Sequence, residues 1–199
     1  MKVIVVSQRI DFFPIRNEFR DQLDERLIEF LMDAGYLPVP VPNNLLNQSN
    51  AFDLWMKSIS PTAIILSGGN DIGEYKHRDA LETALLSYAE KLHLPVLGIC
   101  RGMQMMGVIA GAKLKVVDCH VNRRHFLIGD ITREVNSYHK MVLTSCPHDY
   151  EVIAYSPDHE IEAIRHRLLP WEGWMWHPER EEIFSQDDLI RIRHIFADC

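Results

Sequence analysis

The chain has 199 residues, of which 47% are hydrophobic and 25% are charged, a composition typical of a soluble globular protein. This length predicts a single domain over residues 1–199. A formal net charge of −7 argues against a general nucleic-acid binder, but it leaves room for a local basic pocket that binds a small anionic substrate.

The first third of the chain predicts strands that alternate with helices. Residues 3–6 are a β-branched run, typical of a strand that is buried on both faces. A helix follows and ends at Gly35; its apolar face consists of Leu23, Leu27, Phe30, Leu31 and Ala34. Residues 37–41 could form a second strand despite two prolines, and residues 52–56 suggest a short helix.

The same alternation continues to about Ala110. Ala63–Leu66 predicts a buried strand that leads into a glycine pair, and residues 81–92 predict an amphipathic helix. Val96–Ile99 predicts another strand, and a largely apolar helix follows Cys100. The expected fold is therefore α/β, with three layers: a mostly parallel central sheet and helices on both faces.

The C-terminal half does not show this regular alternation of strands and helices. It predicts short strands at 114–117, 152–155 and 173–176 and an irregular segment at 136–139. The last helix is expected to begin at Ser185, where Asp188 completes a capping-box pattern.

Cys100 has the sequence context of a nucleophile. It is the centre of the pattern Gly98-Ile99-Cys100-Arg101-Gly102, between a predicted strand and a predicted helix. Such a turn strains the backbone of the nucleophile, and the flanking glycines allow the neighbouring backbone to approach closely. A helix N-terminus also favours the thiolate form. The alternative is a buried structural cysteine, but the glycines favour a nucleophile elbow.

A base and an oxyanion hole are also predicted. Glu179 lies two residues after His177, on the same side of an extended segment, so it can orient the imidazole in a Cys–His–Glu triad. The backbone N–H of Arg101 is one expected oxyanion donor, by elbow geometry. Gly69, in the glycine pair after Leu66, is the best candidate for the second donor.

Together these segments resemble the class I glutamine amidotransferase superfamily, which has a flavodoxin-like fold. The matching segments are Ser67-Gly68-Gly69-Asn70-Asp71, Gly98-Ile99-Cys100-Arg101-Gly102-Met103-Gln104, Asn136-Ser137-Tyr138-His139 and His177-Pro178-Glu179. Arginine after the nucleophile is similar to the γ-glutamyl hydrolase branch, peptidase family C26. The resemblance implies no metal and no organic cofactor. The substrate-binding residues that it suggests are Asn70, Gln104, Ser137, Tyr138 and His139.

Two short segments depart from the γ-glutamyl-aminobutyrate hydrolases. Few residues separate Asp71 from the helix that starts near His77, and the segment between Gly111 and Asn136 is also short. Both would open the leaving-group side of the pocket to a larger group. The N-terminal third contains the segments Ser7-Gln8-Arg9, Asn17-Glu18, Arg20-Asp21, Leu23-Asp24 and Pro40-Val41-Pro42-Asn43. This combination is similar to the γ-glutamyl-CDP-amidate hydrolases of capsule phosphoramidate biosynthesis, which implies a nucleotide-linked γ-glutamyl substrate.

A diphosphate would need cationic groups, and the sequence offers Arg9 and the pair Arg123-Arg124. The pair could equally belong to a solvated loop, which is the commoner case. His120 and His125 could be metal ligands, but their spacing fits no zinc pattern, and we predict no metal.

Three functional hypotheses follow: a free-standing γ-glutamyl hydrolase, a glutaminase subunit that passes ammonia to a synthase partner, and a non-catalytic redox sensor. The substrate class points to a small molecule, with no nucleic-acid or membrane partner; a homodimer is left open. Four cysteines without a Cys-x-x-Cys pair, and no signal-peptide pattern, indicate a cytoplasmic location.

Overall fold

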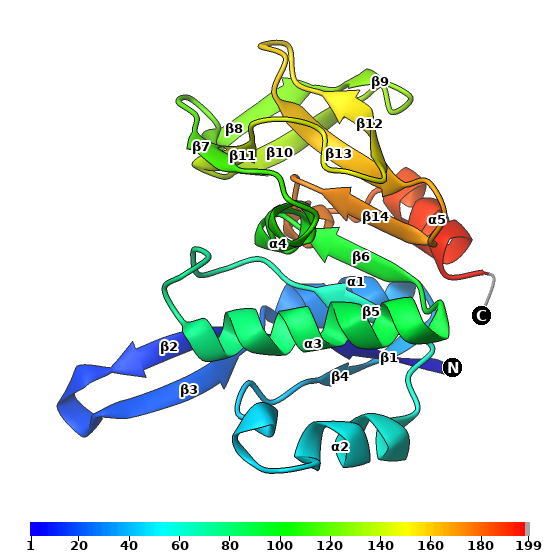
Figure 1. Cartoon of the computed structure of the whole chain (residues 1–199). Coiled ribbons are helices and arrows are strands. Elements are labelled where there is room, and N and C mark those ends of the chain that lie inside the picture. The colour runs from blue at the N-terminus through cyan, green and yellow to red at the C-terminus, as the bar shows by residue number, and fades with distance from the viewer. Residues whose placement is uncertain (198–199) are drawn as a thin grey trace.

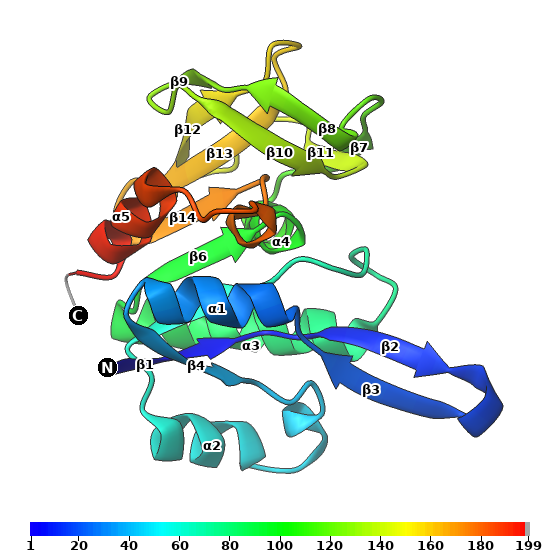
Figure 2. The same ribbon diagram turned by 180° about the vertical axis from the view of Figure 1, so that it is seen from behind.

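A central sheet dominates the computed structural model, which describes residues 1–197 (Figures 1 and 2). Over these residues the sheet has eight strands, in the order β4-β1-β5-β6-β14-β13-β12-β9. The first five strands are parallel, and β13, β12 and β9 continue the sheet antiparallel. The predicted α/β fold with a mostly parallel central sheet is therefore confirmed.

The predicted strands at residues 3–6, 63–66 and 96–99 are all in this sheet. Its members are β1 (Lys2–Val6), β4 (Tyr36–Pro40), β5 (Ala63–Leu66), β6 (Val96–Ile99), β9 (Ile128–Gly129), β12 (Tyr150–Tyr155), β13 (Ile161–His166) and β14 (Trp171–Trp174). The prolines at positions 38 and 40 are accepted because β4 is the edge strand.

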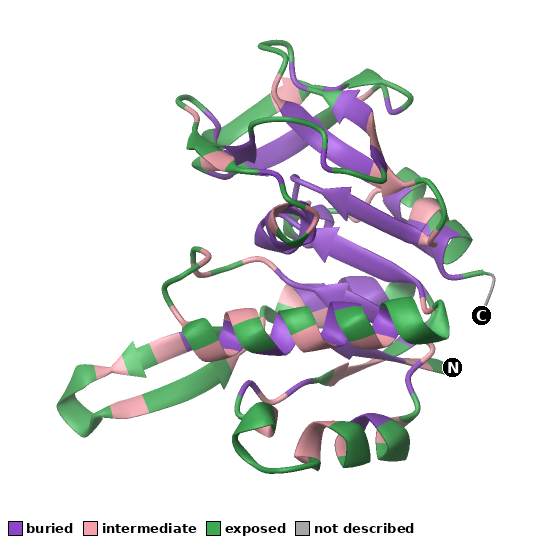
Figure 3. Cartoon of the chain, in the orientation of Figure 1, coloured by how far each residue is buried: buried purple, intermediate pink, exposed green. Residues whose placement is uncertain are grey.

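Helices cover both faces of the sheet (Figures 1 and 2). Those packed on one face are α1 (Glu25–Asp33) and α5 (Gln186–Ile195), and those on the other are α2 (Ala51–Ile59), α3 (Lys76–Leu92) and α4 (Arg101–Ile109). Successive residues of a strand point to opposite faces, so Ile4 and Val6 join one core while Val5 joins the other. The buried residues consequently run through the sheet and the inner sides of the helices (Figure 3).

A long β-hairpin, which the sequence did not predict, projects from the carboxyl end of the sheet (Figure 1). It consists of β2 (Arg9–Phe13) and β3 (Glu18–Gln22), joined by the 3₁₀ turn Pro14–Arg16. Its base is held by Asn70, whose amide bonds both the N–H and the carbonyl of Ile10 at 2.8 and 2.9 Å.

One prediction for the C-terminal half was wrong. Residues 136–139 are not irregular: β10 (Glu134–Tyr138) pairs with β8 (Val121–Phe126), with a bulge between Ser137 and Tyr138. A second small ladder joins β7 (Leu114–Val116) to β11 (Met141–Leu143). The polar β10 forms a strand with its middle residues buried, and its side chains Asn136 and Ser137 have partners in other segments.

Helix α5 does begin after Ser185, but not through a capping box. The hydroxyl of Ser185 accepts a hydrogen bond from Arg133 at 2.7 Å and does not cap the helix. Asp188 is buried, and it pairs with Arg133 and accepts from the Trp176 indole N–H at 3.3 Å. Both side chains therefore fasten the helix to β9–β10 instead of closing its own first turn.

Four loops meet at the carboxyl edge of the parallel strands, where ligands bind in open α/β sheets. Ser7 follows β1, Ser67 follows β5, Cys100 follows β6, and His177 comes shortly after β14. None of the helices within residues 1–197 combines the length and the apolar character that a membrane crossing requires.

Candidate active site

Cys100 occupies a strained turn between β6 and α4. Its backbone angles are φ 51° and ψ −105°, which a side-chain-bearing residue rarely adopts. The N–H of Cys100 donates to the carbonyl of Trp174 at 2.6 Å and so fastens the turn to β14. The geometry is that of a nucleophile elbow, in which a side chain is presented at the end of a sheet.

The two flanking glycines are required for close packing, as the pattern predicted. A Cβ on Gly98 would lie 2.6 Å from the backbone of Gly102, and a Cβ on Gly102 would collide with the carbonyl oxygen of Leu66. The elbow therefore sits directly against β5, the strand that leads into the glycine pair.

His177 is held firmly beside the elbow. Asn136 clamps its backbone: the His177 N–H donates to the Asn136 side chain at 2.9 Å, and the Asn136 amide donates to the His177 carbonyl at 2.7 Å. The imidazole Nδ1 lies 2.6 Å from a carboxylate oxygen of Glu179, and the side chain of Cys100 is near enough to act on the pKa of the ring. The structure thus brings Cys100, His177 and Glu179 together.

The charge on His177 depends on these neighbours. Burial lowers the pKa of His177, but Cys100 and Glu179 outweigh that effect and raise it to about 10. The ring is therefore protonated at neutral pH in this arrangement. An imidazolium beside a sulfur atom is the charge state from which a cysteine nucleophile can attack.

The glycine pair after β5 lies against the histidine ring. A Cβ on Gly68 would approach the His177 ring to 2.8 Å, so no larger residue fits there. Gly69 adopts φ +116°, a conformation open to glycine, and a Cβ there would lie 2.7 Å from Arg9. The loop predicted to supply an oxyanion donor therefore lies next to the elbow; its role as a donor stays a prediction.

A buried ionic network connects the glycine loop to the elbow. Glu82 of α3, which is fully buried, pairs with Arg101 of the elbow and with Arg78 at 3.2 Å. Arg78 donates to the carbonyls of Ser67 and Gly68, each at 2.9 Å. One carboxylate therefore anchors both loops.

Arg78 and Glu82 of this network have further electrostatic and hydrogen-bond partners. Burial lowers the pKa of Arg78 to about 10, although Glu82 acts in the opposite direction, so the guanidinium keeps its proton. The hydroxyl of Ser7 donates to Glu82 at 2.8 Å, and Arg101 also pairs with Asp79. The side chain of Arg101 thus has a structural use besides the oxyanion role expected of its backbone.

The residues suggested as substrate contacts lie at different depths. Gln104 is buried and donates to the Met141 carbonyl at 2.9 Å. The Ser137 hydroxyl donates to the His120 carbonyl at 2.6 Å, and His139 is buried. Tyr138 is partly exposed, with its ring 5.9 Å from that of His177. Substrate binding by these residues, and by Asn70 at the hairpin base, remains a prediction.

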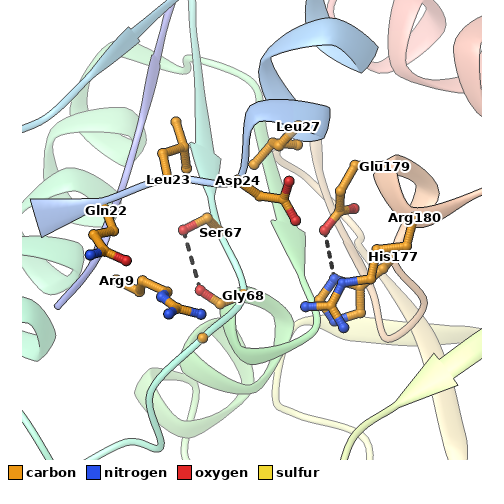
Figure 4. A pocket seen from close by; sticks show the side chains of 11 residues that line it. Arg9, Gln22, Leu23, Asp24, Leu27, Ser67, Gly68, His177, Glu179 and Arg180 are labelled. Atoms are coloured by element: carbon orange, nitrogen blue, oxygen red, sulfur yellow. Dashed lines mark hydrogen bonds and ion pairs between the residues drawn. The ribbon is translucent and has the colours of Figure 1, made fainter. Parts of the chain in front are cut away.

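Two cavities lie beside this site. The first has a volume of about 260 Å³, and the glycine loop, His177 and Glu179 line it (Figure 4). Arg9 and Arg180 line it, and Cys100 is not among its lining residues. The second, of about 460 Å³, is lined by Asn122, Arg123, Arg124, Asn136, Tyr138 and Arg180. Arg180 belongs to both cavities, and its guanidinium stacks 4.7 Å above the Tyr138 ring.

Comparison with known families agrees with this architecture. The model of the family described as glutamine amidotransferase class-I matches residues 17–191. The chain belongs to this family. Class I glutamine amidotransferases are hydrolases that act on C–N bonds, and the coarse activity expected from the sequence is therefore supported.

Individual relatives point to different substrates. The γ-glutamyl-CDP-amidate hydrolase of Campylobacter jejuni is 31% identical over 135 residues, or 65% of this chain and 68% of that protein. One subunit of the glutamine-hydrolysing GMP synthase of Methanocaldococcus jannaschii is 31% identical over 126 residues, covering 58% of this chain and 63% of that protein. A crystal structure from Thermoplasma acidophilum, provisionally assigned as a GMP synthase subunit, superposes with a TM-score of 0.74 at 20% identity and covers 99% of this chain and 93% of that one. The last match concerns the fold alone.

Sequence reasoning missed several residues that organise the amidotransferase site. Arg78 and Glu82 stand four apart on α3, a spacing that suggests an ion pair but looks like an exposed one. Asn136 is in one of the segments that resemble the family, but its hydrogen bonds to the backbone of His177 join parts of the chain that are far apart in sequence.

The fold also gathers residues that the sequence left apart. His120, His125 and Glu162 bring one potential metal-ligating atom each to within 4.8 Å of one another. The sequence offered the two histidines, but Glu162 lies on β13, well beyond any local spacing pattern.

Proposed function

We propose that this protein is a cysteine hydrolase of γ-glutamyl amides, with Cys100 as nucleophile, His177 as acid and base, and Glu179 as the group that orients His177. One observation carries the proposal. Cys100 stands at a strained elbow next to an imidazole whose Nδ1 lies 2.6 Å from a buried carboxylate. A structural cysteine would need neither the strain nor the relay.

The reaction proceeds through a γ-glutamyl thioester. The Cys100 thiolate attacks the γ-carbonyl carbon and forms an S–C bond, while N–H groups of Arg101 and the Gly69 loop stabilise the oxyanion. The C–N bond breaks, and the leaving nitrogen takes a proton from His177. Water then attacks the thioester and gives a proton to His177; glutamate leaves and the thiolate is restored.

The leaving group is proposed to be anionic and nucleotide-like. Arg9 and Arg180 line the first cavity, while Arg123 and Arg180 line the second, so arginines line both cavities beside the site. Arg123 forms no ion pair with another residue in 1–197, whereas Arg124 pairs with Glu134 and Glu181. The similarity to the Campylobacter jejuni γ-glutamyl-CDP-amidate hydrolase supports the same class of leaving group.

The test is a panel of γ-glutamyl conjugates: a nucleotide amidate, aminobutyrate, a polyamine and glutamine itself. Released glutamate is measured by mass spectrometry with the purified chain alone. We expect the nucleotide amidate to give the highest kcat/KM. Cys100→Ala should abolish turnover but retain substrate binding. Normal turnover by this variant would remove the basis of the proposal.

A glutaminase subunit is the second candidate, favoured by the 31% identity to a subunit of a glutamine-hydrolysing GMP synthase. Such a protein would hydrolyse glutamine and pass ammonia to a synthase partner. It should be nearly silent alone and become active when the partner is added. Rapid partner-free turnover of any γ-glutamyl conjugate would favour the free-standing hydrolase.

A further inference from the structure

Three histidines surround one buried carboxylate beneath the β8–β10 ladder. Glu162 of β13 is fully buried, as its exposed fraction is 0%, and His120 and His139 are nearly so. His125 of β8 completes the group with a side chain that is 11% exposed. Within residues 1–197, neither carboxylate oxygen of Glu162 has a hydrogen-bond partner of good geometry. A buried carboxylate without such partners is costly, which points to a missing charge.

The spacing of the ligand atoms fits a metal better than hydrogen bonds. Nδ1 of His120 and Nε2 of His139 lie 3.4 and 3.3 Å from the same oxygen of Glu162, and 3.4 Å from each other. Charge-assisted hydrogen bonds would be shorter, about 2.7–2.9 Å. Four ligands at about 2.0–2.1 Å from a tetrahedral zinc ion stand about 3.3–3.4 Å apart. The three atoms therefore outline one face of such a tetrahedron.

His125 is the candidate for the fourth position, and its side chain would have to turn toward His139 to take it, because the compact group of ligand atoms comprises only His120, His125 and Glu162. Nε2 of His125 lies 3.4 Å from the second oxygen of Glu162 and, within the described residues, has no hydrogen-bond partner. Its candidate ligand atom is within 4.8 Å of those of His120 and Glu162. Three imidazoles and one carboxylate supply four nitrogen and oxygen donors, which is the number of ligands in a tetrahedral zinc site.

His120 is already oriented as a metal ligand would be. Its Nε2 lies 2.9 Å from a carboxylate oxygen of Asp158, and the Ser156 hydroxyl donates to the other oxygen at 2.5 Å. Since Nε2 faces Asp158, Nδ1 is the nitrogen that faces Glu162 and is placed to bind a cation there. A carboxylate behind a ligating histidine is the usual outer support.

We propose that His120, His125, His139 and Glu162 bind one zinc ion that has a structural role. The ion would join β13 to β8, to the residue before β8 and to the residue after β10. The ion would also support the active site through β10, because Asn136 of that strand holds the backbone of His177 by two hydrogen bonds. The sequence-based prediction of no metal rested on local spacing alone, and this ligand set is not local.

Metal content tests the proposal directly. The full chain, untagged and carrying Cys100→Ala so that the reactive thiol is not a ligand, is analysed for metals by mass spectrometry, then stripped with a chelator and titrated with Zn²⁺ or Co²⁺. We expect uptake of one ion per chain, a rise in Tm with Zn²⁺, and a tetrahedral Co²⁺ spectrum without a sulfur-to-metal band. If no metal is retained and the stripped protein neither takes up Zn²⁺ nor changes its Tm, the proposal is overturned. The cluster is then held by an additional proton on His120.

Variants distinguish this cluster from adventitious binding. In the same Cys100→Ala chain, His125→Ala should lose the ion, and its partial exposure makes this change tolerable for folding. Asp158→Asn keeps all four ligands and should weaken the affinity by about 10–100-fold. The matched control is His148→Ala, at a histidine whose side chain is 85% exposed, and it should bind as its parent does. Equal binding by all three variants would overturn the assignment.

Discussion

The strained turn at Cys100 is possible because Gly98 and Gly102, on either side of it, have no side chains. Gly102→Ala would place a Cβ against the Leu66 carbonyl, and the elbow must shift to relieve it. We expect a loss of about 1–3 kcal/mol in the free energy of unfolding. We also expect kcat to fall by about 10²-fold, because the nucleophile moves. Urea unfolding and steady-state kinetics measure the two effects.

Gly73→Ala is the control for this substitution. Gly73 has φ +94° but nothing within 4 Å of a Cβ, so alanine there adds strain without a collision. It should lower stability and leave kcat unchanged. A similar loss of kcat in both variants would mean that the elbow is not specially constrained.

The protonation of His177 makes a second prediction at the scale of single residues. Its pKa is raised from 6.5 to about 10, and although burial opposes the shift, Cys100 and Glu179 cause it. Since the raised value belongs to the folded state, protonated His177 stabilises the fold fully below about pH 6.5. That contribution is lost as the pH rises through about 10.

Cys100→Ser removes the neighbour that does most to raise the pKa of His177 and should therefore lower that pKa. A pH titration of the His177 Cε1 proton by NMR should show a lower midpoint in the variant, and the loss of stability should begin at a lower pH. An unchanged midpoint would mean that the thiolate does not set the charge of the imidazole.

At the scale of elements, α3 holds two loops through one carboxylate. Glu82→Gln breaks the ion pairs to Arg101 and Arg78 and leaves two buried cations without their partner. We expect a loss of about 3–5 kcal/mol in the free energy of unfolding. Turnover should fall further than the unfolded fraction explains, since the elbow and the glycine loop lose their common anchor.

Glu29→Gln is the matched control, because Glu29 pairs with Arg26 on the exposed side of α1. Its free energy of unfolding, measured by the same urea titration, should not change within error. If Glu82→Gln behaved like this control, the network would be incidental to the site.

The elements differ in how far the sequence could predict them. β5 and β6 have the predicted bounds because short apolar runs bounded by polar residues are unambiguous in a buried parallel strand. The β2–β3 hairpin lacks such a signal, since both of its faces are largely exposed and its strands carry charges. β10 was missed because Asn136 and Ser137 are polar but buried, each with a partner from another segment.

The residues of the candidate site also differ in how far the sequence could predict them. The elbow, His177 and Glu179 could be identified because each is part of a short local pattern. Arg78, Glu82, Asn136 and Glu162 could not, because their roles depend on contacts across the fold.

For the whole molecule, a formal net charge of −7 coexists with arginines around the site. Arg180→Gln should raise KM for a γ-glutamyl nucleotide amidate by about tenfold or more, since a charge-assisted contact is lost. Its KM for glutamine should not change. The wild-type KM for the amidate should rise with added salt.

Arg167→Gln is the control, since Arg167 is exposed and outside both cavities. It should leave both KM values unchanged. If Arg180→Gln raised KM equally for glutamine, Arg180 would act on the γ-glutamyl half of the substrate and not on the leaving group.

The position of Arg78 also bears on how such an enzyme can diversify. The glycine loop is fastened by a side chain that lies beyond the turn at residues 71–75, not by the turn itself. We therefore expect this turn to accept insertions of varied length while Gly69 stays in place. The range of substrates could then change during evolution through the length of this turn, without any change to the catalytic residues. The short turn of this protein would leave the pocket open to large leaving groups.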